Sequence, residues 1–161
     1  MSFTFRKMTP ADMDQAHAMV SDWDVVRQTS RWPWPPDRAF TEGRFLSNPS
    51  DNLMSIAVFD GDTLLGCGGL LDGEFGLMVA RPHWRRGVGR AIAEHLIPPA
   101  FADGADVIRS EVWIDNPGSQ ALHTALGFTE TGRTISDCRA RGERVEAITY
   151  RLTRDAWEAR T

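Results

Sequence analysis

The sequence predicts a mixed α/β domain in which an antiparallel-dominated sheet is flanked by helices. Three observations lead to this fold class. An apolar segment at 75–79 passes through a glycine-containing turn into a helical pattern at 89–101. Asp60-Gly61-Asp62 separates two further apolar segments, as an Asp-Gly hairpin turn does. The segments 128–134 and 143–152 are suited to a final antiparallel pair.

Composition limits the classes of protein that remain. The chain has 161 residues, of which 42% are hydrophobic, and we therefore expect a single domain over residues 1–161. A net charge of −4 argues against general nucleic-acid binding. No apolar run has membrane-spanning length and no signal-peptide pattern is present, so we expect a cytoplasmic protein without membrane association. Cys67 and Cys138 match neither a disulfide framework nor a metal site, and we expect no metal.

The N-terminal elements follow from their local signals. Alternation at 3–6 predicts a short strand. A helix then begins at Thr9, with Thr9 as N-cap and Asp12 as the acid of a capping box. A second helix is predicted over 37–46, ending before Asn48-Pro49.

The segment between these two helices is rich in tryptophan and proline. Three tryptophans and three prolines lie within residues 23–36, which predicts a stiff loop. Such aromatic side chains either cover a hydrophobic core or line a binding cleft, and Trp32 and Trp34 are the candidates for a cleft wall. Asp22 and Asp24 are candidates to attract a cationic amine, although loop acids are also commonly just solvated.

The middle of the chain reads as strands followed by the central turn and helix. Strands are expected at 54–59 and 63–71, and the glycines of the second suggest a bulge or a close neighbour. A turn at Asp72-Gly73 leads into a strand at 74–79. The helix at 89–101 is expected to be interrupted near its end by Pro98-Pro99.

The last third adds a strand, a helix and an arginine-rich hairpin. A strand is expected at 106–114, and a helix at 117–126 with Asn116 as N-cap and Gly127 at its C-terminal end. The hairpin arginines are expected to be solvated, or alternatively to hold a nucleotide or a partner: Arg133, Arg139, Arg141 and Arg144.

The turn between the central strand and helix has the composition of a phosphate site. Gly87 and Gly89 allow the backbone to approach an anion, and the first N–H groups of a helix lack internal partners. Three arginines add cations with forked donors: Arg85, Arg86 and Arg90. The turn is neither a P-loop nor a complete dinucleotide fingerprint, so a plain structural turn is an equal alternative.

Two motifs resemble the GNAT superfamily of N-acyltransferases. The stretch Arg81–Ala91 resembles its [QR]-x-x-G-x-[GA] loop, with Trp84 where Gln or Arg is usual. The stretch Asn116–Phe128 is similar to the N-x-x-S-x-x-x-x-x-x-L-G-F segment of the branch with ribosomal-protein-alanine acetyltransferases, in which Trp also occurs at the first position. The resemblance spans nearly the whole chain and is tightest over Glu74–Phe128.

The resemblance implies a mostly antiparallel sheet of about seven strands, with a splayed strand pair where acetyl-CoA binds. It further implies a backbone N–H, of Met78 or Val79, that polarises the thioester carbonyl. The residues that it assigns to acetyl-CoA are Leu77, Met78, Val79, Trp84, Arg85, Arg86, Gly87, Val88, Gly89, Arg90, Asn116 and Ser119.

The resemblance also suggests the groups that move protons. Ser119 and His123 lie one turn apart on one helix face, and either one is expected to protonate the departing thiolate. Glu74 and Glu111 are the candidate bases for the amine, and a water chain is the alternative.

We therefore predict an acetyl-CoA-dependent N-acetyltransferase that acts by direct attack on the thioester. Its acceptor is expected to be the N-terminal amine of a protein or peptide. The alternatives are a small amine such as a polyamine or antibiotic, and a non-catalytic acyl-CoA sensor. Acetyl is the expected group, a longer acyl group stays open, and either a monomer or a homodimer is compatible.

Overall fold

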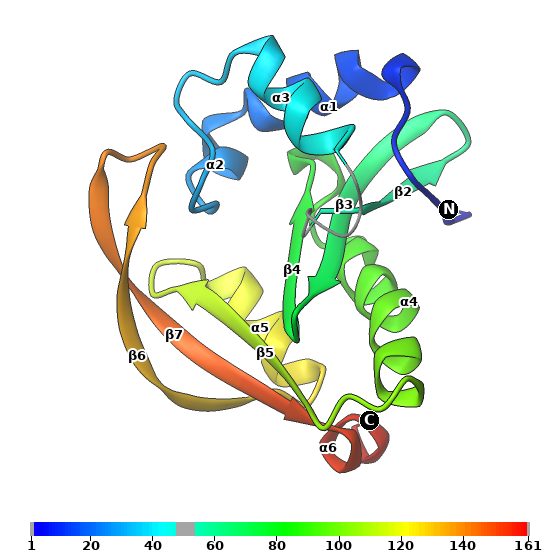
Figure 1. Cartoon of the computed structure of the whole chain (residues 1–161), viewed down its shortest axis with the longest axis vertical. Coiled ribbons are helices and arrows are strands. Elements are labelled where there is room, and N and C mark those ends of the chain that lie inside the picture. The colour runs from blue at the N-terminus through cyan, green and yellow to red at the C-terminus, as the bar shows by residue number, and fades with distance from the viewer. Residues whose placement is uncertain (1, 48–53, 161) are drawn as a thin grey trace.

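A computed structural model describes residues 2–47 and 54–160 (Figure 1). Within these residues a seven-stranded sheet has the order β1-β2-β3-β4-β5-β7-β6. The strands are β1 (Thr4–Arg6), β2 (Ile56–Asp60), β3 (Thr63–Leu71), β4 (Glu74–Val79), β5 (Val107–Trp113), β6 (Thr129–Cys138) and β7 (Glu143–Thr153). The α-helices are α1 (Met13–Val20), α2 (Trp23–Val26), α3 (Arg38–Phe45), α4 (Val88–Ala102), α5 (Pro117–Ala125) and α6 (Arg154–Ala159).

The β4–β5 pair interrupts an otherwise antiparallel sheet. These two strands are parallel and pair at one position, Glu74 opposite Arg109, where Arg109 N donates to Gly73 O at 2.7 Å. Beyond this position the strands diverge, as Figure 1 shows between β4 and β5. The predicted fold class, a mostly antiparallel sheet with a splayed pair and flanking helices, is confirmed.

The sheet separates two hydrophobic clusters. Helices α1–α3, grouped at one end in Figure 1, pack with one face, and α4, α5 and α6 pack with the other. The division follows strand alternation, because Ala57 and Phe59 belong to the first cluster and Val58 to the second. No helix among the described residues combines the length and apolarity that crossing a membrane requires.

Local signals placed several element ends correctly. Thr9 and Asp12 form the expected capping box, and Asp37 accepts from Phe40 N at 2.7 Å. Asn48-Pro49 lies outside the described residues. Both predictions for the glycine-rich strand are confirmed: β2 and β3 shift register after Val58, and a Cβ on Gly66 would lie 2.5 Å from Met78 O.

Three local predictions need correction. Pro98 and Pro99 do not interrupt α4, which continues to Ala102, because both prolines lie on the exposed face and the unpaired carbonyls can be hydrated there. The tryptophan–proline segment contains a short helix, α2, capped by Asp22. Helix α6 was missed, although its N-cap Thr153, which accepts from Ala156 N at 3.2 Å, is an ordinary start signal.

Candidate functional site

The turn after β4 ends in an uncapped helix start. Gly87 is the N-cap of α4 at φ 81°, a left-handed conformation that favours glycine, and no side chain caps the helix. The first helical hydrogen bond is from Ala91 N to Gly87 O at 3.0 Å. The N–H groups of Val88, Gly89 and Arg90 therefore have no helical acceptor, which is the arrangement that binds an anion.

The arginines of the turn differ in how far they are already paired. Arg85 and Arg86 are exposed and form no ion pair with the described residues. Arg90 lies 3.8 Å from Glu94, a weak exposed pair. Two guanidinium groups thus remain for a polyanionic ligand beside the free N–H groups.

Gly89 brings three elements of the site together. A Cβ on Gly89 would lie 2.8 Å from Leu122 Cδ2 and 3.8 Å from Leu77 Cδ1. The start of α4 therefore packs directly on α5 and on the diverging part of β4. A larger residue at this position would have to displace the Leu122 side chain.

The free edge of β4 offers backbone groups next to the turn. Ala80 N donates to Leu65 O at 2.9 Å, and the antiparallel register then places the backbone groups of Met78 toward β3. Those of Phe75, Leu77 and Val79 face the side from which β5 has diverged. Strand alternation thus favours Val79 over Met78 as the exposed N–H donor.

Side chains cover two of the three carbonyls on this edge. Ser110 Oγ on β5 donates to Phe75 O at 3.0 Å, and Trp84 Nε1 donates to Val79 O at 2.8 Å. Neither contact follows from a local sequence pattern, since each joins residues whose approach depends on the fold. The N–H and C=O of Leu77 are not paired with a neighbouring strand.

Helix α5 carries a half-buried Ser119 next to a buried His123. Asn116 Oδ1 accepts from Ser119 N at 3.2 Å, and Ser119 is half-buried. His123 is 3% exposed, with Nδ1 2.7 Å from Ser119 O and 3.4 Å from Ser119 Oγ. Its Nε2 lies 2.8 Å from Ser110 Oγ. Both ring nitrogens of His123 are thus engaged inside the protein.

The hydrogen positions around His123 allow two neutral tautomers. In one, Nδ1 donates to Ser119 O and Nε2 accepts the single hydroxyl proton of Ser110, which then cannot be donated to Phe75 O. In the other, Nε2 donates to Ser110 Oγ, and the Ser110 hydroxyl donates to Phe75 O. Burial lowers the pKa of His123, and the Ser119 carbonyl opposes this to a smaller extent. The structure therefore favours neutral His123 at pH 7, placed behind Ser119.

Glu74 and Glu111 share a pocket on the opposite sheet face. Strand alternation puts Glu111 and its neighbour Ser110 on different faces of β5. The pocket has a volume of about 300 Å³ and also contains Arg109, Arg151 and Thr149. Loss of solvent around the carboxyl group, and secondly the charge of Glu74, raises the pKa of Glu111.

The residues expected to bind the acceptor lie in different surroundings. Trp32 is 3% exposed and packs on Phe40 and Phe45 in the core, with ring centroids 5.1 Å away in each case. Trp34 is 42% exposed and lies edge-on to Trp23. The structure thus gives Trp32 the core position and leaves Trp34 at the surface.

The two acids of the same segment are already paired with a cation. Arg81, which follows β4, lies 2.7 Å from Asp22 and 3.8 Å from Asp24. This pairing reduces the negative charge that Asp22 and Asp24 would offer to an amine. It also fastens the N-terminal end of α2 to the end of β4.

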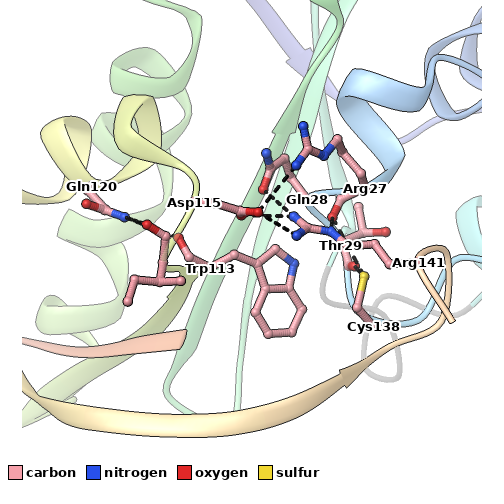
Figure 2. Close-up of polar contacts among 9 residues, drawn as sticks. Arg27, Gln28, Thr29, Trp113, Asp115, Gln120, Cys138 and Arg141 are labelled. Carbon is pink, nitrogen blue, oxygen red and sulfur yellow. Dashed lines mark hydrogen bonds and ion pairs between the residues drawn. The ribbon is translucent and has the colours of Figure 1, made fainter. Parts of the chain in front are cut away.

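The C-terminal end of α2 is fastened to the end of β5, as Figure 2 shows. Asp115, two residues after β5, accepts from Arg141 at 2.6 and 3.0 Å and lies 3.3 Å from Arg27. Arg141 also donates to Arg27 O at 2.9 Å, and Cys138 Sγ donates to Thr29 O at 3.3 Å. The prediction of a solvated hairpin is wrong for Arg141, whose side chain is 8% exposed, because three segments converge on its guanidinium group.

Much of the chain is similar in sequence to known acetyltransferases. Residues 2–129 match the family model described as acetyltransferase (GNAT) domain. A [ribosomal protein bS18]-alanine N-acetyltransferase of Salmonella typhimurium is 26% identical over 113 residues, covering 67% of this chain and 72% of that protein.

Solved structures share the fold at lower identity. An acetyltransferase from Salmonella typhimurium with its cofactor acetyl-CoA superposes with a TM-score of 0.67 and 21% identity, covering 95% of this chain and 94% of that one. Spermidine N-acetyltransferase from Vibrio cholerae, in complex with CoA and spermine, has a TM-score of 0.76 and 16% identity, with coverage of 97% and 98%.

Proposed function

The chain belongs to the GNAT acetyltransferase family, and we propose that the amine it acetylates is the N-terminal amine of a protein or peptide. The reaction class is acetyl transfer from acetyl-CoA to an amine. The single observation that carries the residue assignments is the uncapped α4 start beside the free edge of β4.

The chain's residues divide the binding task between charge and backbone. Arg85, Arg86 and the first N–H groups of α4 would hold the pyrophosphate of acetyl-CoA. The open groups of Leu77 would pair with the pantetheine arm, and Val79 N–H would donate to the thioester oxygen as negative charge develops there. No covalent enzyme intermediate is required, because a positioned amine can attack directly.

The proton balance assigns the remaining side chains. The amine nitrogen forms a bond to the carbonyl carbon, the C–S bond breaks, and one proton passes from the amine to the CoA sulfur. Glu111, whose raised pKa suits a base, would receive the proton of the amine directly or through water, with Glu74 beside it. The Ser119 hydroxyl would give a proton to the departing sulfur and recover one from water, to which Glu111 returns the proton of the amine. Neutral His123 would hold Ser119 in place through its Nδ1 contacts.

One observation bears on the acceptor class. The bS18-alanine acetyltransferase relative favours a protein N-terminus.

A polyamine is the second candidate acceptor. The pocket offers the carboxylates of Glu74 and Glu111 to an amine, with Arg109 and Arg151 also in its lining, and the Vibrio cholerae neighbour was solved with spermine. A non-catalytic sensor would use the same turn and β4 edge but would not need Ser119 or Glu111.

The test is thiol release from acetyl-CoA with alanine-starting peptides, spermidine and an aminoglycoside as acceptors. Peptide-dependent release supports the proposal, spermidine-dependent release supports the second candidate, and binding without any release supports the sensor. Ser119→Ala should lower kcat by about 10- to 100-fold with acetyl-CoA affinity retained. Thr124→Ala, an exposed position on α5, is the matched control and should leave kcat unchanged.

A further inference from the structure

We propose that Trp84 is a positioning residue that fixes the register in which the thioester-bearing arm of acetyl-CoA pairs with β4. The proposal rests on the proposed function, because it concerns the same binding edge. It assigns a task to a side chain that is 43% exposed and makes a hydrogen bond of 2.8 Å to Val79 O.

The outward groups of β4 would otherwise repeat. Phe75, Leu77 and Val79 each direct N–H and C=O to the same edge, and successive outward residues are about 6.6–6.8 Å apart. An extended arm with one donor and one acceptor could pair with any complete set. Pairing with the neighbouring outward residue instead would move the thioester carbonyl by about 6.6–6.8 Å.

Side chains and the neighbouring strand occupy some of these backbone groups, so the outward residues of β4 are not equivalent. At the closed end, the pairing with β5 and the Ser110 hydroxyl cover the groups of Phe75. At the open end, Trp84 covers Val79 O and leaves its N–H. Among the described residues of this edge, Leu77 alone offers a complete donor–acceptor set, with Val79 N–H as the next donor.

The electrostatic effect acts in the same direction. An unpaired Val79 carbonyl would place a negative dipole end on the edge where the oxyanion develops. The indole N–H offsets this partial charge. The Trp84–Val79 hydrogen bond therefore prevents the Val79 carbonyl from pairing with the arm and from repelling the oxyanion.

The position of Trp84 separates this role from core packing. Trp84 belongs to neither buried cluster, and it follows the 3₁₀ turn at Arg81–His83. Arg85 comes next in a left-handed conformation at φ 59°, so the chain reverses while the indole lies back against the strand end. Losing the N–H should therefore affect catalysis more than folding.

The test compares Trp84→Phe, which keeps an aromatic ring without a donor, with Trp84→Gln, which keeps a donor. Initial rates of thiol release give kcat and KM for acetyl-CoA, and calorimetry gives the affinities for acetyl-CoA and CoA. In Trp84→Phe we expect kcat to fall about tenfold or more while KM changes less than threefold. The preference for acetyl-CoA over CoA should also be lost, because the acetyl carbonyl no longer meets Val79 N–H in register.

Trp84→Gln should recover part of kcat and of this preference, and both variants should melt near the wild-type temperature. Wild-type kcat and preference in Trp84→Phe would overturn the register proposal alone. Equal losses in both variants, with CoA affinity falling in parallel, would also overturn it by showing a general binding role. A wild-type chain that neither binds acetyl-CoA nor releases thiol would overturn the proposed function and this inference with it.

Discussion

Removing Asp115 should destabilise the protein more than removing its partner Arg141. The Arg141 side chain is 8% exposed and that of Asp115 is 41% exposed, with the two joined at 2.6 Å. Asp115→Ala leaves a buried guanidinium group without its carboxylate, which costs about 3–5 kcal/mol when water is fully excluded. The half-exposed Asp115 position admits water, so we expect about 2–3 kcal/mol.

Arg141→Met leaves a carboxylate that can recover much of its hydration. Asp115 also retains Arg27 at 3.3 Å, and Met fills part of the volume of the arginine stem. We expect a loss of about 1 kcal/mol. Asp137→Ala is the matched control on the same hairpin, because Asp137 is 90% exposed and lies 3.8 Å from Arg144.

Urea unfolding at pH 7 measures the free energy of unfolding of the wild type and of the three variants. Arg141 lowers the pKa of Asp115, so its contribution is present above the unfolded-state pKa and is lost as pH falls through that of the folded state. The difference between wild type and Asp115→Ala should therefore shrink below about pH 4. A larger loss in Arg141→Met than in Asp115→Ala, or an Asp115→Ala no worse than Asp137→Ala, would refute this reasoning.

Three further predictions concern stability. Asp12 is buried and paired with Arg6, which lowers its pKa to about 2; Asp12→Asn should cost about 2 kcal/mol at pH 7, and the cost should disappear between about pH 4 and 2 in urea titrations. Gly66→Ala would place its Cβ 2.5 Å from a backbone oxygen and should destabilise the protein by more than about 2 kcal/mol. Gly43→Ala in α3, whose Cβ would meet nothing within 4 Å, should stabilise it by up to about 1 kcal/mol. Thermal melts would compare the two variants. Burial lowers the pKa of His123, so the unfolded chain binds the extra proton first and stability should fall as pH drops below about 6.5; His123→Gln should flatten that slope, and an unchanged slope would contradict the assignment.

Local chemistry made much of the fold predictable. The capping box at Thr9, the Asp-Gly hairpin at Gly61 and the N-cap Asn116 each involve residues within a few positions, so sequence shows both partners. These local predictions required no knowledge of how distant segments meet. The expectation that Arg85, Arg86 and Ser119 share one cofactor site came instead from the family resemblance.

Contacts between distant segments could not be predicted. Arg81 pairs with Asp22 across 59 positions, and Arg141 contacts Arg27 across 114. The sequence shows the charges without showing which of them neutralise one another. The same limit explains why Trp32 and Trp34 were equal candidates, since only packing separates the buried ring from the exposed one.

Helix α2 acts as a brace across the open end of the splayed strands. Asp22 ties one of its ends to the segment after β4, and Arg27 ties the other to the segment after β5. The four residues Trp23–Val26 rise about 6 Å along the helix axis, and this length limits how far the two strand ends can separate. The separation of the β4 and β5 ends is therefore set by residues outside the sheet. Lengthening or shortening α2 should therefore change the separation of the β4 and β5 ends without altering a residue of either strand.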